Sequence, residues 1–146
     1  MKARVNMLSA VESHPIAGNW APGVLTRYRQ FAATLAGDHE LEVTIGRGGL
    51  SFYAETAAGR TFICHFNAAP RSGREDLGFV DFRPLDLAPQ LDPHAVVADL
   101  RQRLGASVDL RSGKIWHSAH FDSGREVGVA ESFRQSVVEP LLVGSS

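Results

Sequence analysis

The chain has 146 residues, of which 44% are hydrophobic and 21% are charged, a balance typical of a folded domain rather than a disordered segment. Its formal net charge is −1, so no strong field draws it to nucleic acid or to an anionic membrane, and we expect neither as a partner. No apolar run has the length of a secretory signal core or a membrane span. These properties together predict a cytoplasmic protein.

Helix breakers divide the chain into three predicted parts. An N-terminal arm covers residues 1–22, where prolines and glycines interrupt any long element. A single domain follows over residues 23–143, and residues 144–146 form a short C-terminal tail.

The first half of the domain alternates one helical pattern with strand patterns. Residues 24–35 carry apolar side chains at helical spacing, and Gly37 lies where such a helix would end. Strict alternation over residues 39–46 predicts a half-buried strand. Residues 50–55 and 60–67 predict a hairpin, and residues 77–83 predict a further strand.

The second half contains the best-marked helix of the chain. Asp92 suits the N-cap position, Pro93 the first helical position and Gly105 the residue after the last turn. A final helix over residues 123–143 would begin with a capping box formed by Ser123 and Glu126. Pro140 is expected to disturb its last turn.

Between these helices, residues 106–110 and 113–121 predict a β-hairpin. Its turn would lie at Ser112-Gly113 and would place Leu110 opposite Ile115 and Val108 opposite His117. The whole order is helix, three or four strands, helix, β-hairpin and helix. We therefore predict an α+β single domain with a mostly antiparallel sheet packed by helices.

The histidines of "GKIWHSAHFD" follow from this strand prediction. Alternation would point His117 inward and His120 outward, on the face that carries Trp116 and Asp122. Two histidines on opposite faces could not bind one metal ion. The sequence therefore predicts no metal site here.

Cys64 is the only cysteine, so neither an internal disulfide nor a thiolate metal cage is available within one chain. By alternation it shares a face with Phe62 and Phe66, which predicts a small buried hydrophobe. His65 would lie on the other face with Ile63, out of reach for a Cys–His catalytic pair. The sequence contains no recognisable catalytic motif, and we assign no catalytic residue and no cofactor.

The helix "VLTRYRQFAATLAG", the strands "GLSFYAE" and "RTFICHFN", and the terminal "VDLRSGKIWHSAHFDSGREVGVAESFRQSVV" have an order that resembles class I type III secretion chaperones and YbjN-like proteins. The resemblance covers about residues 23–142 and rests on element order. It implies a small dimer that binds an extended partner polypeptide without catalysis. The near-neutral charge of this chain differs from the acidic character of secretion chaperones.

The stretch "GKIWHSAHFDSG" before a C-terminal helix is also similar to the YdhG-like family of small cytoplasmic domains, some of which are described as iron chaperones. This resemblance is short and implies no particular functional residue.

Two functions are compatible with these patterns. The first is a non-catalytic interaction or chaperone-like module that binds a polypeptide partner and associates as a homodimer. The second is a small-ligand or iron-binding protein, or a small enzyme, with a pocket built across strands. The candidate ligand-binding residues of that pocket are His65, Trp116, His120 and Asp122.

Overall fold

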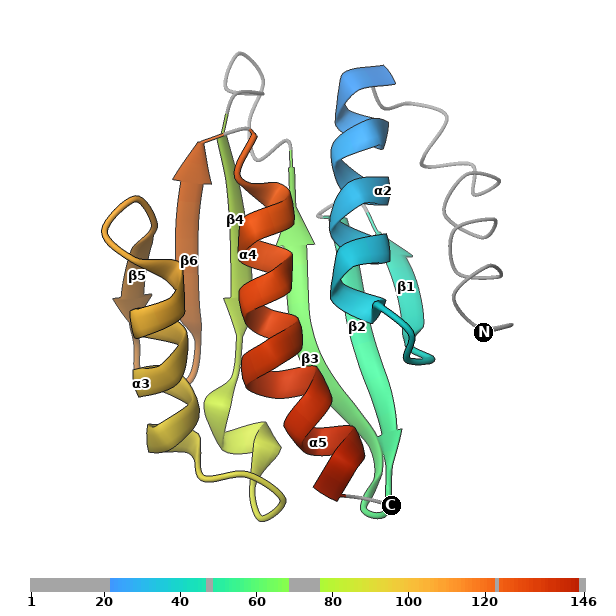
Figure 1. The fold of residues 1–146 in the computed structure, drawn as a ribbon, viewed down its shortest axis with the longest axis vertical. Coiled ribbons are helices and arrows are strands. Elements are labelled where there is room, and N and C mark those ends of the chain that lie inside the picture. Colours follow the sequence, from blue (N-terminus) through green and yellow to red (C-terminus); the bar gives the residue numbers. More distant parts are fainter. Residues whose placement is uncertain (1–21, 47–48, 69–76, 123, 145–146) are drawn as a thin grey trace.

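A computed structural model describes residues 22–46, 49–68, 77–122 and 124–144 (Figure 1). In these residues, six strands form one sheet and helices lie along one of its faces. The elements in chain order are α2 (Pro22–Ala36), β1 (Glu42–Gly46), β2 (Gly49–Thr56), β3 (Gly59–Asn67), β4 (Leu77–Phe82), the 3-10 turn η2 (Pro84–Leu87), α3 (Pro93–Leu104), β5 (Asp109–Ser112), β6 (His117–Asp122), α4 (Glu126–Phe133), the π-helical turn η3 (Arg134–Val138) and α5 (Glu139–Gly144). The predicted α+β class is confirmed, with four strands between the first two helices. Residues 1–21 of the predicted arm lie outside the described ranges.

The strand order across the sheet is β1-β2-β3-β4-β6-β5, and every neighbouring pair is antiparallel. Strands β1 to β4 lie side by side in their chain order. The chain then runs through α3 before β5 and β6 add to the free edge of β4. Because β6 inserts between β4 and β5, its longest pairing is with β4 rather than with its hairpin partner.

The hydrophobic core lies between the sheet and the helix layer. Phe31 of α2, Phe52 of β2 and Phe66 of β3 are each 0% exposed, and the rings of Phe31 and Phe66 stack with centroids 4.2 Å apart. Burying a side chain of this size contributes roughly 1.5–3 kcal/mol. Among the described residues, the helices lie on one face of the sheet and none lies on the opposite face (Figure 1). We call it the open face.

The predicted bounds of α3 and the predicted end of α2 are confirmed, whereas α2 begins at Pro22, which was predicted to belong to the N-terminal arm. Asp92 accepts a hydrogen bond from the backbone N–H of His94 at 3.0 Å, which satisfies one of the free donors at the start of α3. Gly105 ends that helix with φ 73°, a conformation in which glycine avoids the strain of a side chain. Gly37 follows α2 in the same way, with φ 56°.

The C-terminal helix differs from its prediction at both ends. It begins at Glu126, with Arg125 in the N-cap position, so the predicted capping box of Ser123 is wrong; Ser123 itself lies outside the described residues. Pro140 does not end the helix, because the π-helical turn before it accommodates a residue that has no N–H to donate. No helix within the described ranges is long and apolar enough to cross a membrane.

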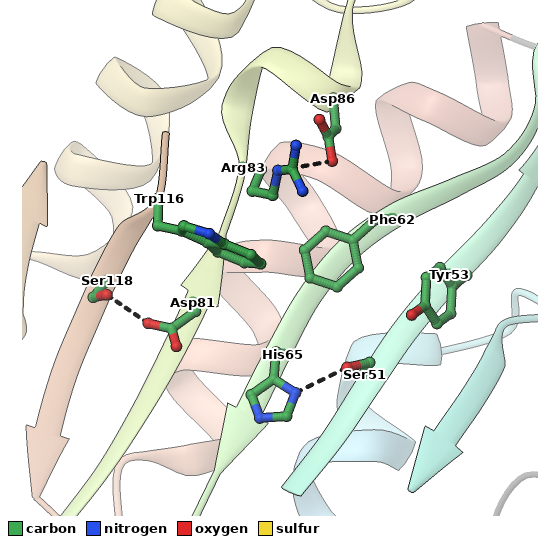
Figure 2. A pocket seen from close by; sticks show the side chains of 9 residues that line it. All are labelled: Ser51, Tyr53, Phe62, His65, Asp81, Arg83, Asp86, Trp116 and Ser118. Atoms are coloured by element: carbon green, nitrogen blue, oxygen red, sulfur yellow. Dashed lines mark hydrogen bonds and ion pairs between the residues drawn. The ribbon is translucent and has the colours of Figure 1, made fainter. Parts of the chain in front are cut away.

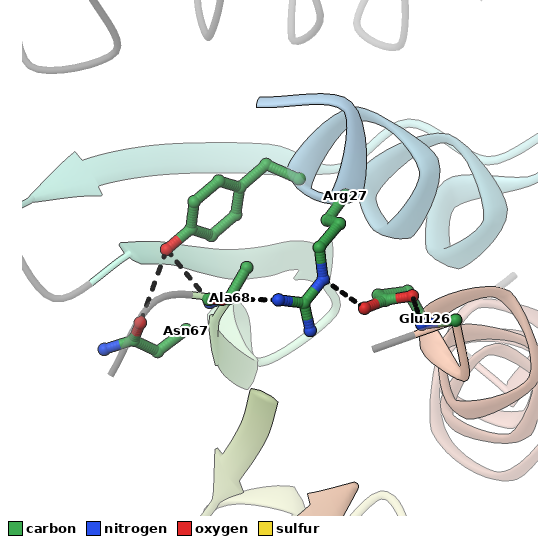
Figure 3. A network of polar contacts seen from close by, with 6 residues as sticks. Arg27, Asn67, Ala68 and Glu126 are labelled. Atoms are coloured by element: carbon green, nitrogen blue, oxygen red, sulfur yellow. Dashed lines mark hydrogen bonds and ion pairs between the residues drawn. The ribbon is translucent and has the colours of Figure 1, made fainter. Parts of the chain in front are cut away.

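A buried ion pair fastens α2 to the start of α4 (Figure 3). The guanidinium of Arg27 donates to the carboxylate of Glu126 and, through Nη1, to the backbone carbonyl of Ala68 at 2.6 Å. Glu126 also accepts the N–H of Gly124 at 2.8 Å. The Tyr28 hydroxyl accepts the N–H of Ala68 at 3.1 Å. These contacts hold the end of β3 against both helices.

A β-bulge in β3 changes which side chains reach the open face. Phe52 is paired with Cys64, but the next residue of β2, Tyr53, is paired with Phe62, so Ile63 is the extra residue. On either side of Ile63, the side chains of β3 therefore alternate between the two faces in opposite phase. The predictions that Phe62 shares the face of Cys64, and Ile63 that of His65, are wrong: Ile63 is buried in the core, while Phe62 turns to the open face.

The β5–β6 hairpin forms, but its register differs from the prediction. Leu110 is paired with Ala119 and Ser112 with His117, so the connection is the four-residue loop 113–116 instead of a turn at Ser112-Gly113. The N–H of Gly113 donates to the carbonyl of Trp116 at 3.0 Å and closes this loop. The shift from the predicted register is an even number of residues, so the predicted facing is kept: His117 lies on the helix side and is half-buried.

Candidate functional site

A pocket of about 600 Å³ lies on the open face of the sheet (Figure 2). It spans β2, β3, β4 and β6 and is bordered by the loops that follow β4 and precede β6. The lining residues are Ser51, Tyr53, Phe62, His65, Asp81, Arg83, Asp86, Trp116 and Ser118.

Strand alternation explains most of this lining. Ser51 and Tyr53 are two positions apart on β2 and share a face. In the ladder, His65 is opposite Asp81, and Asp81 is opposite Ser118, so three strands contribute one polar row. Phe62 joins the same face because of the bulge in β3.

Three aromatic rings form a row across the pocket (Figure 2). The rings of Tyr53 and Phe62 lie 5.6 Å apart between centroids, and those of Phe62 and Trp116 lie 5.8 Å apart in an edge-to-face arrangement. Trp116 remains 46% exposed, because the loop 113–116 carries it outward from the end of β6. The row is thus partly exposed on the open face rather than part of the core.

Each end of the row is covered by a guanidinium of the chain itself. Arg60 lies over the Tyr53 ring at 3.8 Å from its centroid, and Arg83 lies over the Trp116 ring at 5.3 Å. Each of these arginines also forms an ion pair with a carboxylate. The Nε atom of Arg60 lies 3.1 Å from Oε2 of Glu42, and the Nε atom of Arg83 lies 3.3 Å from Oδ2 of Asp86.

Two hydrogen bonds organise the polar side of the pocket. The Ser51 hydroxyl and the Nδ1 atom of His65 are 2.8 Å apart, and the Ser118 hydroxyl donates to Asp81 at 2.5 Å (Figure 2). Both bonds run between neighbouring strands. The sheet therefore positions these groups before any ligand is bound.

The structure brings together two of the four predicted binding residues. His65 and Trp116 both line the pocket, whereas His120 and Asp122 do not. His120 stacks on Phe79 with ring centroids 5.7 Å apart, and burial lowers its pKa, assisted by the positive charge of Arg111 and opposed by nearby carboxylates. Asp122 is exposed at the far end of β6.

The chemistry available to the site is that of aromatic, carboxylate, guanidinium and imidazole groups. Within the described ranges, no group of three or more histidine, cysteine, aspartate or glutamate side chains could hold a metal ion. Cys64 is on the core side of β3, where burial raises the pKa of its thiol far above the usual range. It is therefore an inert core residue, as predicted, and not a nucleophile for this pocket.

Sequence reasoning missed most of the lining. Asp81 and Arg83 alternate with buried residues in "FVDFR", so their common face was a signal that could have been used. Phe62 had no such signal, since alternation without a bulge assigns it to the core. Asp86 lies in a 3-10 turn and reaches the pocket only through the path of the chain after β4.

No family model, curated protein or solved structure matches this chain.

Proposed function

We propose that the protein is a non-catalytic interaction module that binds an extended segment of a partner polypeptide in the pocket on the open face. The observation that carries this proposal is the preformed row of Tyr53, Phe62 and Trp116 on the sheet face opposite the helices that the structure describes. Aromatic residues and arginine are the side chains most enriched at the energetic centres of protein interfaces.

The shape of the surface favours a polypeptide over a small molecule. Pockets for small ligands usually enclose most of the ligand surface, whereas this pocket is open along the sheet. A second hollow of about 530 Å³ lies on the other side of the loop 113–116, where Leu85 and Ile115 are 66% and 57% exposed. A chain segment that crosses this loop could contact both hollows.

The same geometry gives less support to an enzyme. A serine hydroxyl hydrogen-bonded to a histidine, as in Ser51 and His65, is one element of a nucleophilic site. Such a site also needs backbone or side-chain donors aimed at a developing oxyanion. Here both residues lie within the paired strands β2 and β3, whose backbone donors serve the sheet ladder. Binding is the better-supported function.

We also propose that the chain self-associates as a homodimer. The exposed side chains of Leu85 and Ile115 line the second hollow together, and exposed Trp116 follows Ile115 in the loop 113–116. Light scattering at increasing protein concentration tests this directly. A monomer throughout the concentration series would contradict the homodimer and leave a different polypeptide as the partner.

A displayed library of random peptides, selected on the full-length protein, tests the binding function. We expect enriched peptides whose affinity falls at least about tenfold with Phe62→Ala and with Trp116→Ala, the usual loss for a central interface residue. Val127→Ala is the matched control, since Val127 is exposed to the same degree as Trp116 but lies on α4 outside the pocket. Absence of enrichment, or equal losses for all three variants, would contradict the proposal.

A further inference from the structure

The charged groups around the aromatic row repeat one arrangement twice. Tyr53 is covered by the guanidinium of Arg60, which faces the carboxylate of Glu42. At the other end, Trp116 is covered by Arg83, which faces Asp86. In each case a ring, a guanidinium and a carboxylate form one set.

The middle of the row contains only two members of such a set. Phe62 is the central ring, and Asp81 is a carboxylate of the same pocket lining, opposite His65 on the neighbouring strand. Asp81 accepts a hydrogen bond from Ser118, and among the described residues it forms no ion pair. Arg111 is opposite Ser118 in the ladder, and its Nε atom lies 2.8 Å from a carboxylate oxygen of Asp109.

These ion pairs determine which charged groups of the pocket remain without a partner of opposite charge. The lining contains two carboxylates, Asp81 and Asp86, and one guanidinium, that of Arg83, which is paired with Asp86. The surplus negative charge is therefore that of Asp81, which is half-buried next to aromatic surface. A partly desolvated carboxylate attracts a cation more strongly than an exposed one, because the surrounding dielectric is lower.

Resting on the proposed polypeptide-binding function, we propose that the pocket recognises an arginine side chain of the partner. Its guanidinium lies against Phe62 and takes Asp81 as its carboxylate, which completes the third set. Arginine fits better than lysine because its planar guanidinium can stack on a ring and meet a carboxylate in the same plane. The two intramolecular sets each place a guanidinium over a ring of the row and near a carboxylate.

The fluorescence of Trp116 provides a direct test with a small probe. The sequence has two tryptophans, so Trp20→Phe in the full-length chain leaves Trp116 as the only one. This protein is titrated with Nα-acetyl-arginine amide and with the matching citrulline amide, which has nearly the same shape without the charge. We expect a saturable change with arginine at a concentration at least about tenfold lower than with citrulline.

Two variants assign the selectivity to Asp81. Asp81→Asn should remove the difference between the two probes, whereas Asp122→Asn, at an exposed carboxylate of β6 outside the pocket, should keep it. Both variants are first compared with the parent by urea unfolding to establish that they fold. Equal responses to arginine and citrulline, or equal behaviour of the two variants, would overturn the proposal. A lysine amide that bound as tightly as arginine would overturn the guanidinium assignment.

The failure of this inference can be separated from failure of the binding function. Selected peptides that bind through Phe62 and Trp116 but contain no required arginine would leave the binding function intact and refute the inference. Arginine amide that binds with the stated selectivity, while no peptide is enriched, would support the cation site and refute polypeptide binding.

Discussion

Phe62 and Cys64 are two positions apart on β3, yet their side chains belong to opposite faces of the sheet. Cys64 is fully buried beneath the helices, and Phe62 is half-buried on the open face. The extra residue Ile63 between them produces this arrangement, because a bulge reverses the alternation of the strand beyond it. The bulge thereby supplies the central ring of the candidate binding site.

Alanine substitutions in β3 should reveal this division between faces. Phe66→Ala should lower the free energy of unfolding by about 3–5 kcal/mol, since it removes a fully buried ring from the core. Phe62→Ala should cost clearly less, because that ring is already partly in contact with water. Urea unfolding followed by circular dichroism measures both values. Equal losses would show that Phe62 is a core residue and that the strand has no bulge at Ile63.

Cys64 should be unreactive in the native protein. Burial raises the pKa of its thiol far above the usual range, so the reactive thiolate is scarcely populated at pH 8. Ellman's reagent should therefore detect no rapid thiol in the folded chain and one thiol per chain in urea. The double variant Cys64→Ala/Glu55→Cys carries a thiol at an exposed position of β2 instead and should react at once. Rapid reaction of native Cys64 would contradict its placement in the core.

The Arg27–Glu126 pair should contribute to stability far more than an exposed pair does. Its side chains are 11% and 2% exposed, so removing one charge leaves the other buried without compensation. Arg27→Met should therefore cost about 3–5 kcal/mol in the free energy of unfolding. Glu42→Gln, which breaks the exposed pair with Arg60, should cost about 1 kcal/mol or less. Similar losses for the two variants would contradict the buried placement of Arg27.

Two half-buried histidines should make stability fall in mildly acidic solution. Burial lowers the pKa of His117, with a further contribution from the charge of Arg101, and burial lowers that of His120 as well. The unfolded chain, with pKa near 6.5, therefore binds protons at a higher pH than the native state. Their contribution to stability is complete above pH 6.5 and is lost as the pH falls below that value toward the lowered native pKa.

Urea midpoints measured at several pH values between 8 and 5 test this effect. The variants His117→Asn and His120→Asn should each reduce the fall in midpoint across this range. His94→Asn is the control, since His94 lies exposed in the first turn of α3. A midpoint profile that neither of the first two variants changes would contradict the stated direction of both pKa shifts.

Local sequence patterns were sufficient to predict most of the helices and strands and their order along the chain. The Asp92 cap, Pro93 and Gly105 delimit α3 through interactions within a few residues of the chain, so the sequence predicts its bounds accurately. The apolar alternation of β2 and the buried position of Cys64 are equally local consequences of side-chain spacing. The α+β class follows from these elements, because each has one apolar face that must be buried against another.

Contacts between distant segments account for what the patterns did not predict. The register of β6 is set by six residue pairs with β4, which begins 40 positions earlier in the chain. This register places Trp116 in a loop at the pocket. Pairing with β2 requires the bulge that brings Phe62 to the same surface. Sequence patterns within a few residues cannot predict that Phe62 and Trp116 lie on the same surface. The aromatic row and the carboxylate of Asp81 meet only because a register and a bulge, both properties of paired strands, align four strands on one face.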